Sequence, residues 1–152
     1  MKKYFPLIFI SAVLFAEPLQ LKTYDEFYNS IISGNEVKVV IHYAKTNLIV
    51  EGKPESAPDA IGGMKIDVYE YFAAGTVRND KEFVSTSKSV LIKHPVYGYV
   101  LNYVKMRIYE DETVQVVAQY VDPVTYEVKM DETFMGIIND GKNDEGIYFY
   151  QL

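Results

Sequence analysis

Hydrophobic and polar positions alternate most regularly between residues 98 and 128. One alternating set in the first half of this stretch is mostly apolar and consists of Val100, Asn102, Val104, Met106 and Ile108. A period of two is typical of a strand with one buried face, so we expect this set to point into the core. Residues 114–121 repeat the pattern after a polar break, and Asp122-Pro123 predicts a turn into a further strand at 126–138. The stretch therefore predicts a three-stranded antiparallel meander.

Apolar residues at three- and four-residue spacing, instead of every second residue, mark the only predicted helix, which begins after Thr23. Thr23 and Glu26 have the spacing of a capping box, and Gly34-Asn35 predicts the end of the helix. An apolar stripe at three- and four-residue spacing contains Tyr24, Phe27, Tyr28, Ile31 and Ile32. Because a helix of about ten residues is marginal alone, we expect this stripe to lie on a sheet. A β-branched, alternating segment at 36–43 predicts the first strand of that sheet.

The remaining segments add shorter strands and loops. Gly and Pro predict a loop at 51–59, and Gly62-Gly63 predicts a bulge or a close backbone approach at the start of a strand over 64–72. We expect an edge strand, or a strand with one wet face, at 83–94, a loop at 139–146 and a terminal strand at 147–150. One helix and seven or eight strands predict an α+β fold that is mostly antiparallel β, namely a strongly curved sheet or small barrel with the N-terminal helix packed on it.

The first 16 residues have the pattern of a secretory signal peptide. Met1-Lys2-Lys3 is positively charged, and an uncharged apolar run follows at 4–15. This run is shorter than the roughly 20 residues of a membrane span. We therefore expect removal of residues 1–16, a single domain at 17–152, a periplasmic or secreted location, and no membrane association after cleavage. An uncleaved anchor or a buried N-terminal strand is the alternative.

Composition narrows the classes of partner and chemistry. A formal net charge of -6 argues against nucleic-acid binding, which needs a basic face. The chain contains no cysteine, so disulfides, thiolate metal sites and cysteine nucleophiles are excluded. We expect a monomer with no cofactor and no metal, and a partner that is either a protein or a small molecule.

Two histidines are the side chains best suited to acid–base chemistry near neutral pH. No hydrolase or nucleotide-binding motif surrounds His42 or His94, so ordinary structural roles are favoured. The alternative is a hydrolase-like or metal-assisted enzyme that pairs one of them with a strand carboxylate. Acidic residues at 139–145 offer oxygen ligands for calcium but lack EF-hand spacing, so we interpret the segment as a solvated turn.

A non-enzymatic binding or interaction protein is therefore the leading interpretation, acting through a sheet face or the 52–60 loop. Tyrosines expected on outward strand positions are Tyr69, Tyr71, Tyr99, Tyr103 and Tyr109, which suit either a ligand groove or cross-strand pairing. One hypothesis places Lys65, Asp67, Tyr69 and Tyr99 around a recess at the barrel mouth as a ligand site. The competing interpretation makes Asp67 a polar partner of a neighbouring strand and Asp122 a turn acceptor.

Several segments together resemble the VirK family of small exported bacterial proteins. These are the leader, the 23–26 helix start with Gly34 before the 37–43 strand, GGMKIDVY at 62–69, PVYGYV at 95–100 and VDPVTYE at 121–127. The resemblance covers nearly all of residues 17–152 and is most specific at GGMKID and DPVTY. Family members often carry a cysteine near the position of Lys45-Thr46, and this chain has none. The resemblance implies an exported, virulence-associated protein and no particular reaction, catalytic residue or cofactor.

Overall fold

The computed structural model describes residues 17–152. The predicted signal peptide, residues 1–16, lies outside the described residues. The first half contains, in order, β1 (Leu19–Leu21), α1 (Tyr24–Ile32), β2 (Val37–His42), the 3-10 helix η1 (Tyr43–Lys45), β3 (Asn47–Val50), β4 (Lys53–Ser56), β5 (Ile61–Lys65) and β6 (Tyr69–Phe72). The second half contains β7 (Phe83–His94), β8 (Gly98–Tyr109), β9 (Thr113–Val121), β10 (Val128–Ile137) and β11 (Ile147–Gln151).

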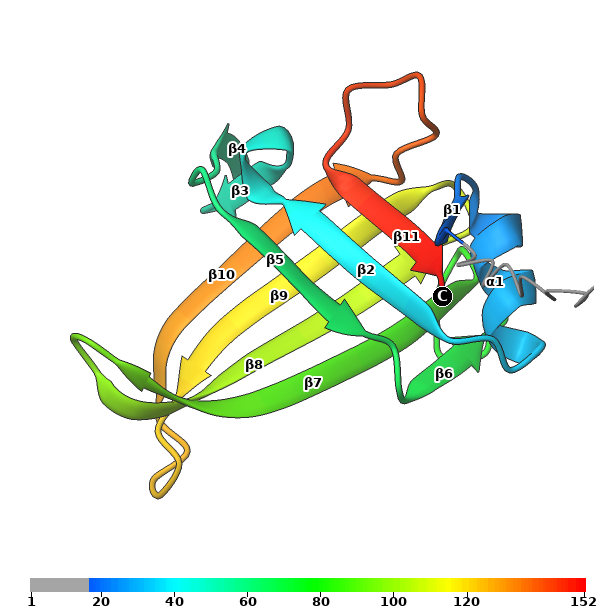
Figure 1. The fold of residues 1–152 in the computed structure, drawn as a ribbon. Coiled ribbons are helices and arrows are strands. Elements are labelled where there is room, and N and C mark those ends of the chain that lie inside the picture. The colour runs from blue at the N-terminus through cyan, green and yellow to red at the C-terminus, as the bar shows by residue number, and fades with distance from the viewer. Residues whose placement is uncertain (1–16) are drawn as a thin grey trace, which may run out of the picture.

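These strands form two sheets that face each other (Figure 1). The large sheet has the order β4-β3-β10-β9-β8-β7-β6, and the small sheet has the order β1-β11-β2-β5. The predicted meander, β8 to β10, occupies the middle of the large sheet, and its inward residues Met106, Ile108, Val114, Val116 and Phe134 are buried. Mostly antiparallel β structure with one helix is confirmed. The two sheets, however, are not closed into a barrel.

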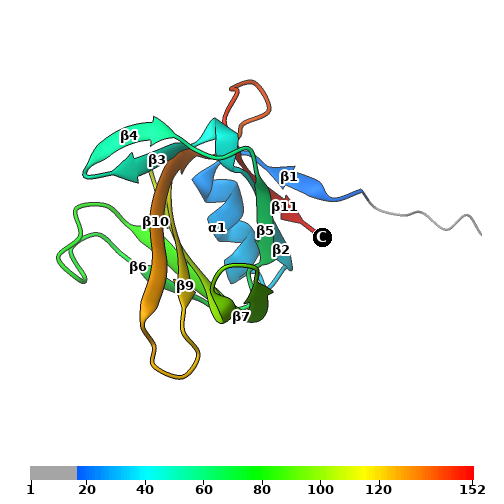
Figure 2. The same cartoon turned by 90° about the vertical axis from the view of Figure 1, so that its left-hand side faces the viewer.

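The helix α1 lies across one end of the space between the sheets, as Figure 2 shows from the opposite end. The Thr23 hydroxyl accepts a 3.2 Å hydrogen bond from the Glu26 amide, as the capping box predicts. The Glu26 carboxylate accepts from the Lys22 amide at 2.6 Å, one residue before the position that a reciprocal box uses. Phe27 is fully buried against Phe149 of β11, with ring centroids 4.6 Å apart. The predicted stripe ends before Ile32, which is 52% exposed.

The predicted segments 51–59 and 64–72 differ in the structure from what the sequence suggested. Residues 51–59 are not one loop, because β3 and β4 form a hairpin. Glu51 and Gly52 both have positive φ, which is the geometry of a tight I′ turn. The predicted 64–72 strand is two strands, since the chain leaves the small sheet after β5 and enters the large sheet at β6.

Gly62-Gly63 permits a close approach between β5 and β2. A Cβ atom on Gly63 would lie 2.7 Å from the Val39 carbonyl oxygen, and the pairing of the two strands has a regular register without a bulge. The close-approach prediction is therefore confirmed. Tyr43, which was expected to continue the first strand, lies in η1 instead.

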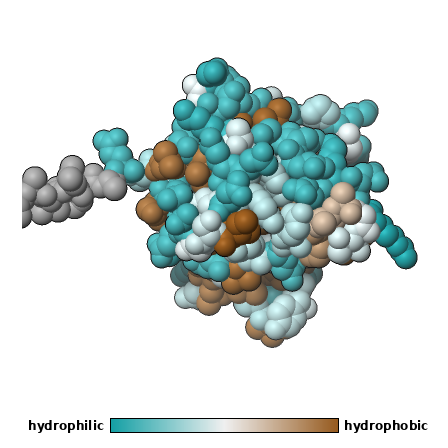
Figure 3. Space-filling model, turned by 90° about the vertical axis from the view of Figure 1, so that its right-hand side faces the viewer, coloured by the Kyte–Doolittle hydropathy of each residue, from teal (hydrophilic) through white to brown (hydrophobic). Residues whose placement is uncertain are grey.

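The surface that carries α1 is largely hydrophilic, with scattered apolar patches (Figure 3). Among residues 17–152, no helix is both long enough and apolar enough to cross a membrane.

Candidate functional site

A cavity of about 350 Å³ lies between the two sheets. One wall comes from the small sheet, η1 and the 57–60 segment, and contains Ile41, Tyr43, Pro58, Ala60, Gly62 and Met64. The other wall comes from β8, β9 and β10, and contains Asn102, Val104, Ala118, Tyr120, Met130, Glu132 and Phe134. Depressions of about 490 and 400 Å³ beside β1 and beside the 77–81 turn are lined mainly by polar residues. The inter-sheet cavity is the candidate site because it lies between both sheets and combines apolar walls with a few polar side chains.

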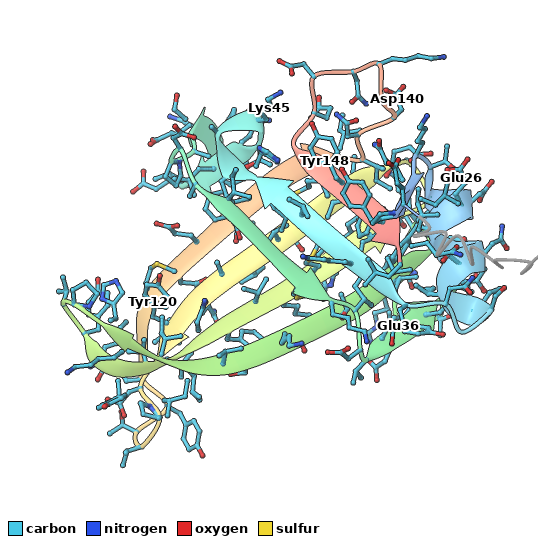
Figure 4. The ribbon with its side chains drawn as sticks, in the orientation of Figure 1. Glu26, Glu36, Lys45, Tyr120, Asp140 and Tyr148 are labelled. Atoms are coloured by element: carbon cyan, nitrogen blue, oxygen red, sulfur yellow. The ribbon has the colours of Figure 1, made fainter. Side chains whose placement is uncertain are left out.

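Strand register explains where polar side chains enter the inner face of the large sheet. The cross-strand row Met106–Val116–Phe134 is apolar and buried. The next row is Val104–Ala118–Glu132, and the one after it is Asn102–Tyr120–Met130. Tyr120 lies near the end of the sheet that is distant from α1 (Figure 4). The two rows farther from the helix therefore place three polar side chains, those of Glu132, Asn102 and Tyr120, among apolar ones.

The Tyr43 ring forms a wall of the cavity that contacts both sheets. Its centroid lies 4.7 Å from that of the Phe134 ring on β10. A Cβ atom at Gly62 would lie 3.0 Å from Tyr43 Cε2, so a larger residue at this position would push the ring by a few tenths of an ångström. The 57–60 segment holds the same residue from its backbone, because the Tyr43 amide donates a 2.9 Å hydrogen bond to the Ala60 carbonyl.

Four polar side chains converge on the cavity without protein partners. Within residues 17–152, the side chains of Tyr43, Asn102, Tyr120 and Glu132 form no hydrogen bond with another protein group, and Glu132 belongs to none of the five ion pairs. Burial raises the pKa of the Tyr43 hydroxyl above its ordinary value, and nearby Tyr120 and Glu132 add to this effect. These groups are thus free to bond a ligand.

The structure places the four sequence-predicted ligand residues outside this cavity. Lys65 pairs with Glu36 at 2.7 Å, and Asp67 pairs with Lys88 of β7 at 2.7 Å. The Tyr69 hydroxyl donates a 3.0 Å hydrogen bond to the Ile31 carbonyl at the end of α1. Lys65, Asp67 and Tyr69 are close in sequence at the crossing between the sheets, whereas Tyr99 is 62% exposed beside Lys93 near the β7–β8 hairpin. The structure does not bring the four together.

Asp67 and Asp122 have the local roles that the sequence suggested. Asp67 bonds a neighbouring strand through Lys88, which lowers the pKa of the Asp67 carboxyl. The Asp122 carboxylate accepts hydrogen bonds from the Val124 and Thr125 amides at 2.9 and 2.8 Å, and these bonds lower its pKa.

The two histidines lie on different sheets. His42 packs edge-on against Tyr148, with ring centroids 5.3 Å apart. His94 Nδ1 accepts weak hydrogen bonds from the Val96 and Tyr97 amides, and its ring lies 4.8 Å from that of Tyr120. Within residues 17–152 neither imidazole forms an ion pair with a carboxylate.

Acidic side chains do not gather into a metal site in the described part of the chain, where no group of three or more His, Asp or Glu could hold an ion. In the 139–146 loop, the Asp140 carboxylate accepts from the Lys142 and Asn143 amides at 2.7 Å, which lowers its pKa. Buried Asn139 donates to the Glu145 carbonyl at 2.8 Å. The oxygen atoms of this loop therefore order its own backbone.

Sequence reasoning missed the cavity residues, although a signal for two of them was present. Asn102 and Glu132 interrupt apolar alternating sets whose other members point inward. A polar residue at an inward strand position is costly to bury, and it therefore indicates either a hidden partner or a wet interior. Tyr43 and Tyr120 carried no comparable signal, because their positions depend on η1 and on strand register.

Comparisons with known proteins agree on a family. No curated protein matches the chain. A VirK family protein from Legionella pneumophila has a crystal structure that covers 86% of this chain, with 97% of that chain covered, a TM-score of 0.63 and 14% sequence identity. At this identity the similarity concerns the fold alone. The family described as VirK protein matches residues 20–126. Since that match spans more than half of the sequence, the chain belongs to the VirK family.

Proposed function

We propose that this VirK family protein is an exported, non-catalytic binding protein that holds a small ligand between its two sheets. One observation carries the proposal: four polar side chains without protein partners converge on an otherwise apolar cavity. Ligand sites in proteins combine apolar walls with a few placed polar groups in this way, and they commonly start at about 300 Å³. The cavity, at about 350 Å³, suits a small molecule.

Chemical composition of the cavity supports binding without catalysis. A nucleophile or acid–base pair needs two groups within hydrogen-bond reach of each other and of a substrate. Among the described residues that line the cavity there is no His, Lys, Ser or Asp, and Glu132 is the one carboxylate. The lining is thus suited to contact and hydrogen bonding.

Export is supported by the leader at residues 1–16, with its short positive region and apolar run. A binding protein outside the cytoplasm meets ligands that come from the environment or from a host.

A cavity-filling variant tests the binding proposal. Ala118 points into the cavity, whereas Val117, the preceding residue on β9, points to the opposite face between Lys105 and Thr133. We would screen a fragment library of neutral, cationic and anionic compounds by ligand-observed NMR against the wild type, A118F and V117F. We expect fragments that bind the wild type and V117F but not A118F. If every fragment that binds the wild type also binds A118F, the cavity is not the site.

A further inference from the structure

We infer that the ligand is a small organic ammonium ion, whose positive charge lies against the Glu132 carboxylate between the rings of Tyr43 and Tyr120. This inference rests on the proposed function and specifies the chemical class of the ligand.

The charge of the ligand follows from Glu132. Within residues 17–152 it is the only charged residue that lines the cavity, and no Lys, Arg or His from this part of the chain lies there to neutralise it. Within residues 17–152 this carboxylate has no ion-pair partner, and a bound cation would supply one inside the cavity. An anion would be repelled, and a neutral apolar molecule would desolvate the carboxylate without replacing its water. The net charge of -6 also favours the approach of cations.

Aromatic rings beside Glu132 indicate an organic cation with substituents on nitrogen. A tyrosine ring face attracts cations, and cages of aromatic residues recognise alkylated ammonium groups. The Tyr43 ring packs against Phe134 and lies close to Gly62, and the Tyr120 ring packs against His94. These packing contacts restrict both rings before a ligand binds, which lowers the entropy lost on binding.

The remaining walls select against a metal ion. Calcium sites in proteins take six to eight oxygen ligands, several of them from carboxylates, whereas Glu132 is the one carboxylate among the described residues that line this cavity. Val104, Ala118 and Met130 instead present apolar surface next to the polar groups. Such walls fit the alkyl part of an ammonium compound.

Pairs of cationic and neutral probes of the same shape test whether the ligand carries a positive charge. We would measure affinities by isothermal titration calorimetry for choline against 3,3-dimethylbutan-1-ol, its neutral carbon isostere, and for butylammonium against 1-butanol. The inference predicts that at least one cation binds about tenfold more tightly than its alcohol. It is overturned if neither cation binds, or if both alcohols bind as well as their cations.

Two neighbouring acidic residues provide the matched variants. Glu132 points into the cavity, whereas Asp131 is exposed and pairs with Gln119 on the outer face of the same sheet. E132Q should abolish the preference for the cation, and D131N should retain it. Because both substitutions remove one negative charge, their comparison separates a local contact from the general field of the protein. A preference that survives E132Q would contradict the inference.

Failure of this inference and failure of the proposed function give different results. If an alcohol binds the wild type without a preference for the cation, and A118F abolishes that binding, the cavity is a ligand site but not an ammonium site. If the probes bind the wild type and A118F equally, the inter-sheet cavity is not the ligand site and the proposed function fails.

Discussion

The Glu112 carboxylate accepts a 2.9 Å hydrogen bond from the backbone amide of Tyr24, the first residue of α1. Glu112 occupies the turn between β8 and β9 with φ at +69°, a conformation that is uncommon for a residue other than glycine. The contact joins residues 88 positions apart and satisfies one of the free amides at the start of the helix. The meander and the helix that closes one end of the molecule are thereby coupled.

Substitution of Glu112 should separate its acceptor role from its charge. E112A removes the acceptor and should lower the free energy of unfolding by about 1 kcal/mol, as the loss of a helix cap does. E112Q retains an acceptor oxygen. Urea unfolding at pH 7 measures both effects, and equal stability of E112A and wild type would contradict the capping role.

The titration of Glu112 should make the free energy of unfolding depend on pH. Burial raises the pKa of its carboxyl above the ordinary value, the Tyr24 amide opposes this, and Asp25 and Glu26 add to it. Because the folded pKa is the higher one, the native state binds more protons than the unfolded chain between the two values. The stabilisation that Glu112 gives through this difference in pKa is fully present below about pH 4.3, and it is lost as the pH rises through the folded pKa. Relative to wild type, E112Q should therefore gain stability between pH 4 and 7, and a constant difference across this range would contradict the expected shift.

Phe27 should carry most of the packing energy of α1. F27A removes a fully buried ring that contacts Phe149, and we expect a loss of about 3–5 kcal/mol in the free energy of unfolding. I32A alters an exposed residue of the same helix and should change stability by less than about 0.5 kcal/mol. Chemical denaturation measures both. Similar effects of the two substitutions would show that the helix packs by another face.

Alanine substitutions at Gly62 and Gly63 should lower the free energy of unfolding by unequal amounts. G63A places Cβ against the Val39 carbonyl of the paired strand, where neither backbone can easily move, and should cost about 1–3 kcal/mol. G62A places Cβ against the Tyr43 ring, a side chain that can shift, and should cost less. Thermal unfolding of both variants measures the difference. A greater loss in G62A would mean that the ring, and not the strand spacing, is the rigid feature.

Much of the fold was predictable because its signals are local. The helix period from Tyr24, the cap at Thr23 and the alternation along β8 each occur within a few residues, and each produces the expected element. The division between β5 and β6 was not predictable, because it depends on Ile66 entering the core while Asp67 turns outward between two sheets. β4 was missed because all of its residues are exposed, so no alternation marks it.

The site was less predictable than the fold for a related reason. Lys65 and Asp67 follow two glycines and were predicted to bind a ligand. In the structure, Lys65 forms an ion pair with Glu36, and Asp67 forms one with Lys88. Glu132 carries the unpaired charge of the cavity, and its position follows only from the pairing of β10 with β9. Which carboxylate has a partner is a tertiary property.

Export predicts a mature chain that begins near Glu17. We would express the full-length protein in a bacterium and measure its intact mass after periplasmic extraction. Loss of the mass of residues 1–16 is expected. Recovery of a soluble cytosolic protein with these residues still attached would refute export.

Methionine methyl NMR tests the central claim, a ligand site between the sheets, most directly. After residue 16 the chain has four methionines: Met64 and Met130 line the cavity, Met106 is fully buried, and Met135 alternates with inward Phe134. We would titrate protein labelled with ¹³C at the methionine methyl groups with choline and with 3,3-dimethylbutan-1-ol. Saturable shifts of the Met64 and Met130 signals, with the Met135 signal unchanged, are predicted for at least one probe. Unchanged Met64 and Met130 signals, or equal movement of Met135, would contradict binding between the sheets.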